Sequence, residues 1–241
     1  MKSGTYLNRV VSCAVLCCTS LVSVGAIYEK AGFYAGLSAG AGYNTGNFIG
    51  NAPGSFIETT DKVSVCGFEK DFCGFIGCMT HLPRENWLAG LEFGIEKPFY
   101  KKHSAITIWN ELDHIPQPEN WQHRIKSIYT AKLHAKVGKI LNENWFVYGL
   151  VGVDMKKTEI SIRGEEIFEN WKENKVLLGV AVGLGIEKEI SENWRLGLEC
   201  TNTYYPARTI KNIDNEPMFV VYKSRIKTNL TQISLRLIHN F

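Results

Sequence analysis

Bulky apolar residues alternate with small or charged residues along most of this chain. The clearest stretch is 176–186, where valine, leucine or isoleucine holds every second position and mostly glycine and alanine lie between. A period of two places the two sets of side chains on opposite faces of an extended strand. One face is oily and the other is small, so this strand should lie between two different environments.

Six other segments alternate in the same way, and 72–82, which is apolar on both faces, supplies an eighth strand. The six are 33–43, 87–96, 125–137, 145–156, 194–201 and 232–241. A membrane helix needs about 20 apolar residues, whereas about ten suffice for a tilted membrane strand. No apolar run after residue 30 approaches the helical length. The pattern therefore predicts an all-β fold of eight strands.

The connections between these strands alternate in length. A Glu-Asn-Trp repeat before Trp87, Trp145 and Trp194 predicts three tight turns, each opening a strand with tryptophan. Long connections are expected at 45–71, 100–122, 158–174 and 207–223. Short turns on one side and long loops on the other are typical of an up-and-down antiparallel transmembrane β-barrel, in which the three tryptophans would mark one membrane interface.

Nine ionisable side chains fall on the small-residue face of these strands. They are Glu92, Glu96, Lys132, Lys136, Asp154, Glu187, Arg195, Glu199 and Arg236. Turned toward lipid they would cost on the order of ten kcal/mol, at about 2–4 kcal/mol for each arginine or lysine at the midplane. They should therefore point inward. Eight strands leave a lumen just wide enough for side chains, so we expect an ion-pair plug, with a narrow channel as the alternative.

The first residues differ from the rest of the chain. Lys2 and Arg9 precede an uncharged apolar stretch that ends in small residues, which predicts a secretory signal peptide over residues 1–26 and a barrel domain over 27–241. A lipoprotein signal at Cys13 is the alternative. Removal of the signal would lower the formal net charge from +3 to near +1. So small a charge gives no reason to expect a nucleic-acid partner.

Four cysteines remain after the predicted signal: Cys66, Cys73, Cys78 and Cys200. An oxidising periplasm permits disulfides, and Cys66 and Cys73 are close enough in sequence to bridge across one hairpin; free buried thiols are the alternative. The chain shows no CxxC pair, no HExxH motif and no other cluster with metal-ligand spacing. We therefore expect neither a metal nor a cofactor.

Three features of the sequence resemble a known group of proteins. The opening Gly32-Phe33-Tyr34-Ala35-Gly36, the Glu-Asn-Trp turns and the closing segment 235–241 resemble the outer-membrane β-barrel superfamily, which includes the outer-membrane protein A barrel and the opacity-type porin-family surface antigens. The resemblance implies an outer-membrane location in a Gram-negative bacterium. It also implies that Leu235, Leu237 and Phe241 form the signal for the barrel-assembly machinery, although His239 departs from that pattern.

The function expected from these features is that of a non-enzymatic structural protein or surface antigen, in contact with outer-membrane lipid. Its outer loops could bind a host surface molecule. The second loop, with Ile106, Ile108 and Trp109, predicts a β-hairpin above the membrane or an adhesive patch. Two further alternatives remain. One is a membrane-embedded lipid hydrolase using His103 and Ser104, and the other is a soluble lipocalin-type carrier.

Overall fold

The computed structural model describes residues 31–51, 60–84, 86–102, 105–108, 120–141, 144–163, 171–213 and 221–241. These ranges form nine strands. None of them contains a helix with the length and apolar character needed to cross a membrane. The predicted signal peptide, residues 1–26, lies outside the described residues.

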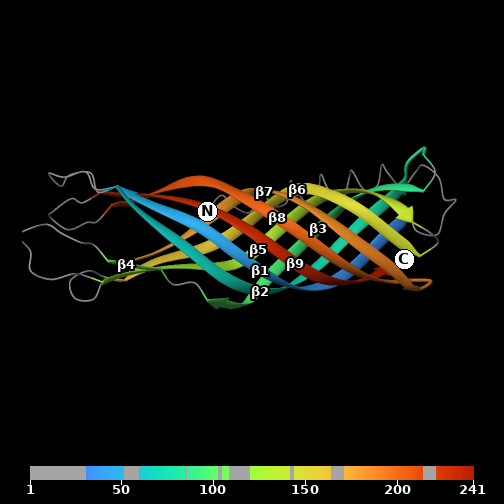
Figure 1. Ribbon diagram of the computed structural model, residues 1–241, viewed down its shortest axis with the longest axis horizontal. Coiled ribbons are helices and arrows are strands. Elements are labelled where there is room, and N and C mark those ends of the chain that lie inside the picture. Colours follow the sequence, from blue (N-terminus) through green and yellow to red (C-terminus); the bar gives the residue numbers. More distant parts are fainter. Residues whose placement is uncertain are drawn as a thin grey trace, which may run out of the picture.

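The strands form one closed antiparallel barrel (Figure 1). Their bounds are β1 Gly32–Asn51, β2 Thr60–His81, β3 Trp87–Lys102, β4 Ala105–Ile108, β5 Asn120–Leu141, β6 Trp145–Arg163, β7 Trp171–Ser191, β8 Trp194–Ile213 and β9 Val221–Asn240. β1 pairs with both β2 and β9, which closes the ring. Both β3 and the four-residue β4 pair with β5, so together they fill one position. The eight-stranded barrel that the sequence predicts is thereby confirmed.

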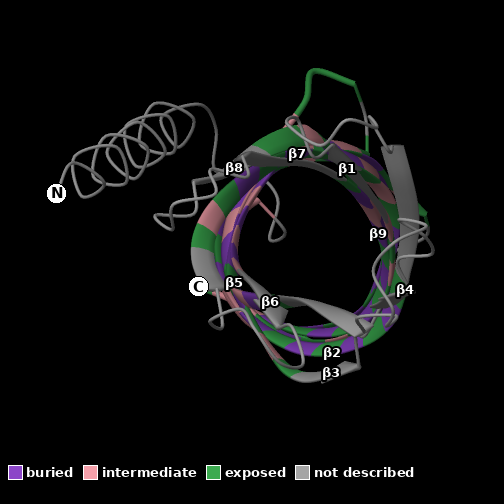
Figure 2. Cartoon of the chain, turned by 90° about the vertical axis from the view of Figure 1, so that its left-hand side faces the viewer, coloured by how far each residue is buried: buried purple, intermediate pink, exposed green. Residues whose placement is uncertain are grey.

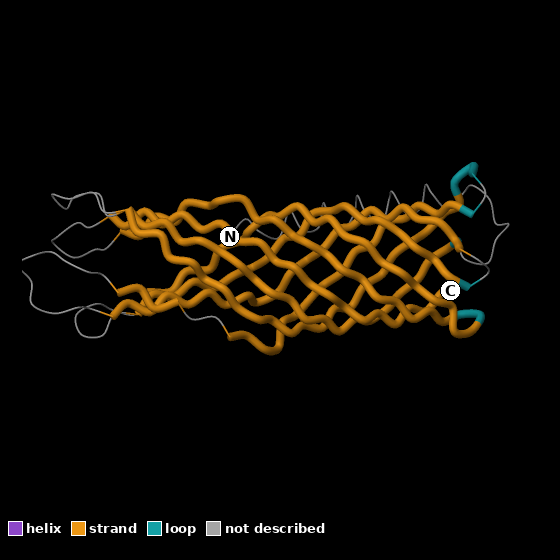
Figure 3. Tube along the Cα trace, in the orientation of Figure 1, coloured by secondary structure: helices purple, strands orange, loops and turns teal. Residues whose placement is uncertain are grey.

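The predicted Glu-Asn-Trp turns connect β2 to β3, β5 to β6, and β7 to β8 at one end of the barrel, called here the short-turn end (right in Figure 3). Asn86 has a φ of 66°, a left-handed conformation that asparagine tolerates better than most residues. The carbonyls of Asn86, Asn144 and Asn193 each accept a backbone hydrogen bond from Ile140, Glu189 and Asn240 respectively. The repeat therefore joins each turn to the next strand of the wall.

The predicted alternation separates the two faces of the wall. Figure 2, a view along the barrel axis, shows buried and exposed residues alternating along the strands of the ring. On β7 the outward Leu184 is 70% exposed, whereas the inward Ala181 is fully buried. Bulky apolar side chains thus cover the outer surface, which is the arrangement of a membrane barrel and the reverse of a soluble carrier.

β5 contains a bulge that interrupts the alternation. Strict alternation over 125–137 would place Lys126 on the inner face with Lys132 and Lys136. In the structure the register with β6 shifts between Ser127 and Tyr129. One additional residue reverses the alternation beyond that point. Lys126 is therefore exposed outside and Ser127 is buried inside.

The predicted long connections were too long, because the strands continue past the expected ends. β1 runs to Asn51 and β2 begins at Thr60, inside the segment 45–71 that was expected to be a loop. β4 pairs with Asn120–His123 of β5, so the expected hairpin begins there. Trp109, His103 and Ser104 lie outside the described residues. The wall is thus about twice as long as the ten residues that a membrane strand requires.

The proposed bridge between Cys66 and Cys73 is also corrected. Both residues lie on β2, where they pair with Thr45 and Ser38 of β1, rather than on two arms of one hairpin. Seven positions along a strand separate their Cα atoms by about 23 Å, far beyond the reach of a disulfide. The odd spacing also directs them to opposite faces. Cys66 is exposed, Cys73 is buried, and both are free thiols.

Candidate functional site

The lumen holds a cluster of four ionised side chains from four different strands. Glu92 of β3, Lys136 of β5, Glu199 of β8 and Arg236 of β9 are all buried; they are called here the central ion cluster. Arg236 donates to Glu199 Oε2 at 2.6 Å and to both carboxylate oxygens of Glu92 at 3.0 and 2.5 Å. Lys136 Nζ lies 2.8 Å from Glu92 and 3.0 Å from Glu199. Two cations and two anions therefore neutralise one another.

Aromatic side chains enclose this cluster. The Tyr34 hydroxyl donates to Glu92 at 2.9 Å, and the Tyr148 hydroxyl donates to Glu199 at 2.7 Å. The Arg236 guanidinium lies 4.1 Å from the centre of the Phe75 ring. Buried ions are tolerated when their remaining donors and acceptors are satisfied, and these hydroxyls complete the carboxylate shells.

Inward glycines give the aromatic rings their space. A Cβ on Gly185 would overlap the Tyr148 ring, and one on Gly77 would overlap Tyr34. The small residues seen in the sequence pattern therefore face bulky rings on neighbouring strands. Large and small side chains alternate around the lumen, which is how so narrow a barrel is filled.

Further polar contacts lie toward each end of the lumen. At the short-turn end, Arg195 donates to Glu187 at 2.8 Å and to Asn240 at 2.8 Å. On the loop side, Lys132 pairs with Glu96, which also accepts from Gln232 at 2.9 Å. Asp154 contacts His134 Nε2 at 2.8 Å and accepts from Thr203 at 2.8 Å. Lys156 lies 3.3 Å from Glu69, which also accepts from Ser127.

All nine charged residues selected from the sequence lie in this lumen, and each has an oppositely charged or hydrogen-bonding partner there. A contact of 4.0 Å between Arg236 and Glu187 links the Arg195–Glu187 pair to the central ion cluster, whereas the contacts of Glu96 and of Asp154 form two separate groups on the loop side. Sequence reasoning missed Glu69, which fell in an expected loop. It also left out His134 and Lys156, although the alternation already placed both on the charged face.

Two rows of aromatic side chains bound the apolar band outside. Trp87, Trp145 and Trp194 open β3, β6 and β8 at the short-turn end. A second row, which the sequence analysis did not identify, consists of the exposed Tyr43, Tyr129 and Tyr204. Trp194 and Tyr204 lie about ten residues apart on β8, which corresponds to roughly 25 Å along the axis for a strand tilted by ~40°. Membrane barrels carry an apolar band of about that height between two aromatic girdles.

The end of the chain takes part in this outer surface. Leu235, Leu237 and Phe241 point outward and are 55%, 40% and 81% exposed. The Phe241 amide donates to the Phe33 carbonyl at 3.0 Å, so the last residue is tied to β1. Their role as an assembly signal stays a prediction.

Comparisons with known proteins agree on the fold. No protein-family model matches the chain, and no curated protein matches its sequence. Among solved structures, it is similar to the outer membrane protease OmpT from Escherichia coli, with a TM-score of 0.51 over 91% of this chain and 100% of that one, at 7% identity. It is also similar to the outer membrane protein OprG from Pseudomonas aeruginosa, with a TM-score of 0.51 over 88% and 97% of the two chains, at 10% identity.

At such low identity these likenesses show the fold alone, and the proteolytic activity of OmpT is that protein's own. They agree with the closed antiparallel barrel described above. The chain therefore has the fold of the bacterial outer-membrane β-barrel proteins.

Proposed function

We propose that this protein is a structural surface protein of the outer membrane of a Gram-negative bacterium, with a lumen that does not conduct. The band between the two aromatic rows would lie in the bilayer, and the strands beyond Tyr43, Tyr129 and Tyr204 would carry the loops outward. The single observation that supports a closed lumen best is the central ion cluster. It joins β3, β5, β8 and β9 across the barrel.

The energetics favour a closed state. Separating Arg236 from Glu92 and Glu199 would leave buried charges without partners, at about 3–5 kcal/mol for a broken buried pair. Opening a path would require several such contacts to part together. Folding stability is commonly only about 5–15 kcal/mol, so the open state would be rarely populated.

Planar-bilayer recording of the refolded barrel tests this proposal. We expect no steady conductance from the unmodified protein. The double variant Glu92→Ala/Arg236→Ala, which removes two crossing side chains, should give brief openings and thereby show that the recording can detect a path. A steady current through the unmodified barrel would contradict the closed lumen.

A narrow ion path is the second candidate. It is supported by buried polar atoms on the loop side of the central ion cluster that make no hydrogen bond to the rest of the protein, namely Asp71 Oδ1, the Thr130 and Thr158 hydroxyls and the Tyr205 hydroxyl. A path along these groups should prefer cations, because the described inward carboxyl groups there, Glu69, Asp71, Glu96 and Asp154, outnumber the lysines Lys132 and Lys156. Cation selectivity in the same recordings would favour it.

The partners follow from the same proposal. Leu235, Leu237 and Phe241 would present the barrel-assembly signal, and the loops would contact a host surface molecule. No catalytic step belongs to this proposal. The double variant His103→Ala/Ser104→Ala should therefore retain every surface property of the protein, and loss of a lipid-hydrolase activity in that variant would contradict a non-enzymatic role.

A further inference from the structure

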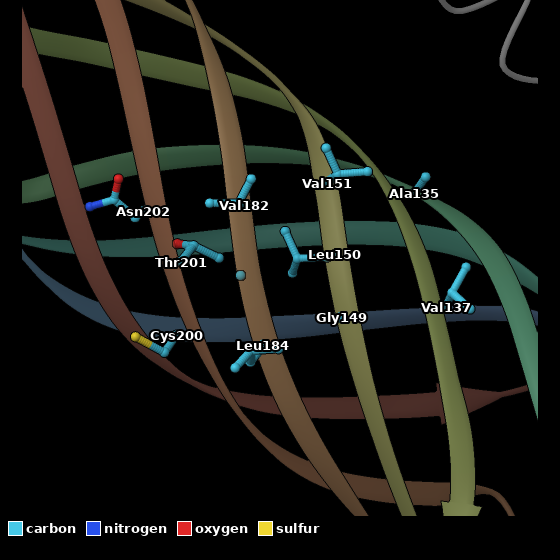
Figure 4. Close-up of a pocket in the computed structure, with 11 residues that line it drawn as sticks. Ala135, Val137, Gly149, Leu150, Val151, Val182, Leu184, Cys200, Thr201 and Asn202 are labelled. Atoms are coloured by element: carbon cyan, nitrogen blue, oxygen red, sulfur yellow. The ribbon is translucent and has the colours of Figure 1, made fainter.

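The outward wall has a hollow on β6 at Gly149 (Figure 4). A Cβ built on Gly149 would meet no heavy atom closer than 4.0 Å, so the position faces open space. Apolar side chains of three strands surround it: Val137, Val151, Val182 and Leu184. This hollow is called here the Gly149 groove. It lies between the two aromatic rows, where the proposed function places hydrocarbon.

A row of cations encircles the barrel where the apolar band ends on the loop side. These outward residues are Lys70, Lys97, Lys126, Lys157 and Lys227, from β2, β3, β5, β6 and β9 respectively. They are called here the basic belt. Among residues with described side chains at this level, the outward acid is Glu159. It lies directly opposite Lys126 in the register of the neighbouring strands β5 and β6. The belt therefore carries an excess of positive charge.

Two belt lysines are held against the second aromatic row. Lys157 Nζ lies 5.7 Å from the centre of the Tyr129 ring, and Lys227 Nζ lies 5.3 Å from that of Tyr204. A cation over an aromatic face keeps its charge available to an anion, whereas a salt bridge to a carboxylate would neutralise it. These lysines are thus positioned for a ligand with negative charge at the membrane surface.

The belt and the groove are aligned on one strand. Lys157, Val151 and Gly149 all point outward from β6. About six residues separate Lys157 from Val151, which is roughly 15 Å along the axis of a tilted strand and matches the hydrocarbon depth of one leaflet. A molecule with an anionic head at Lys157 could therefore place an apolar tail in the groove.

We propose that this wall binds an anionic membrane lipid, with a phosphate of the headgroup at Lys157 and an acyl chain in the Gly149 groove. The inference rests on the proposed membrane location. Charge complementarity selects the phosphate, and the apolar, open-sided groove selects the chain. A neutral lipid would fill the groove without engaging the belt, so the site should distinguish lipids by headgroup charge.

The test uses the barrel refolded into vesicles of phosphatidylcholine and phosphatidylglycerol in equal amounts. After mild detergent extraction, native mass spectrometry counts the lipids that stay bound. The unmodified protein should retain phosphatidylglycerol in preference to phosphatidylcholine. Lys157→Gln should lower the retained phosphatidylglycerol about fivefold, the factor that one lysine near an anionic surface contributes. Gly149→Leu, which fills the groove, should lower retention of both lipids.

Matched changes elsewhere on the wall serve as controls. Lys70→Gln alters another belt lysine, on β2, and Ala39→Leu adds the same bulk to an exposed outward position on β1; neither should change retention. Equal retention of the two lipids, or equal loss in Lys70→Gln, would overturn the inference. A dimer that Gly149→Leu converts to monomer, with unchanged lipid, would identify the groove as an interface between copies.

Failure of the two proposals can be told apart. A folded barrel should migrate differently from the boiled chain on a denaturing gel, and it should float with the vesicles. A barrel that inserts but shows no headgroup preference contradicts only the lipid site. A chain that never inserts contradicts the membrane location itself. Lys157→Gln leaves the groove unchanged and removes only the cation and its contact with the Tyr129 ring, so the test remains decisive even if Gly149→Leu fails to fold.

Discussion

At the scale of single residues, the interior depends on charges that share partners. Arg236 serves two carboxylates and lies against Phe75, whereas Lys136 alone could not neutralise both Glu92 and Glu199. Loss of one member should therefore cost more than loss of an isolated surface ion pair, which contributes about 0–1 kcal/mol.

Replacing Arg236 by methionine should lower the free energy of unfolding by about 3–5 kcal/mol, because it leaves buried negative charge uncompensated. Urea titration of the refolded barrel in lipid vesicles measures this. Lys126→Met, on the exposed side of β5, is the matched control and should change stability by less than about 0.5 kcal/mol. Adding Glu92→Gln to Arg236→Met should restore part of the loss. Equal effects of the two single changes would contradict a coupled cluster.

The inward residues of the apolar band could be predicted from the sequence, because the bulky apolar residues must face outward there and strict alternation then places their neighbours inward. Glu92, Lys136 and Arg236 were found in this way. The alternation could not locate Glu69, since it lies beyond the band, where both faces of β2 carry polar residues. Strict alternation misplaces Lys126, because the one additional residue of the β5 bulge cannot be recognised from the residue types around it.

At the scale of elements, each strand has a lipid-facing part and a part beyond the membrane. On β7 the outward Val176, Val180 and Leu184 are 50%, 54% and 70% exposed. Asn174, two residues before Val176 and nearer the loop side, is on the same face. The change from valine to asparagine marks where hydrocarbon should end. The same strand therefore offers a matched pair of test positions.

Val180→Arg should destabilise the inserted barrel by about 2–4 kcal/mol, since it places a cation in the apolar band. Asn174→Arg, on the same face of β7, should have little effect because it lies beyond the band. Folding yield into vesicles and urea unfolding both report the difference. If the two arginines were tolerated equally, the outward face would not contact lipid.

Strand boundaries were predictable at one end of the barrel only. The Glu-Asn-Trp repeat located all three short turns, because asparagine tolerates turn conformations and the following tryptophan opens a strand; both are local signals. At the other end the strands continue into segments such as 45–51, where apolar and polar residues no longer alternate strictly in the sequence. β4 and the first residues of β5 lie in such a segment; they form the start of the β-hairpin that was one of the two expectations for it.

At the scale of the whole molecule, the barrel is much taller than a bilayer. The two exposed native thiols lie on opposite sides of the predicted membrane boundary. Cys66 is on β2 beyond Phe68 and Lys70, whereas Cys200 is on β8 between Trp194 and Tyr204. They report on the position of the barrel without an added probe.

In cells that display the protein, a membrane-impermeant maleimide should modify Cys66 and leave Cys200 unmodified. Cys200 should react only after the protein is unfolded in urea, because the reactive thiolate does not form in hydrocarbon. Mass spectrometry of the purified protein measures both, with Cys66→Ser and Cys200→Ser identifying each signal. Modification of Cys200 by the impermeant reagent would place the apolar band elsewhere on the wall.

The pairing of β9 with β1 has a consequence for biogenesis. β9 follows the other described strands in the sequence, yet this segment supplies both the seam of the ring and Arg236. Until it arrives, Glu92 and Glu199 share a single lysine, and two open sheet edges expose unpaired amides and carbonyls. Sealing the wall and neutralising its centre thus become one late event, so a barrel whose assembly stalls before β9 pairs with β1 should be recognisable to proteases by its unsealed edges.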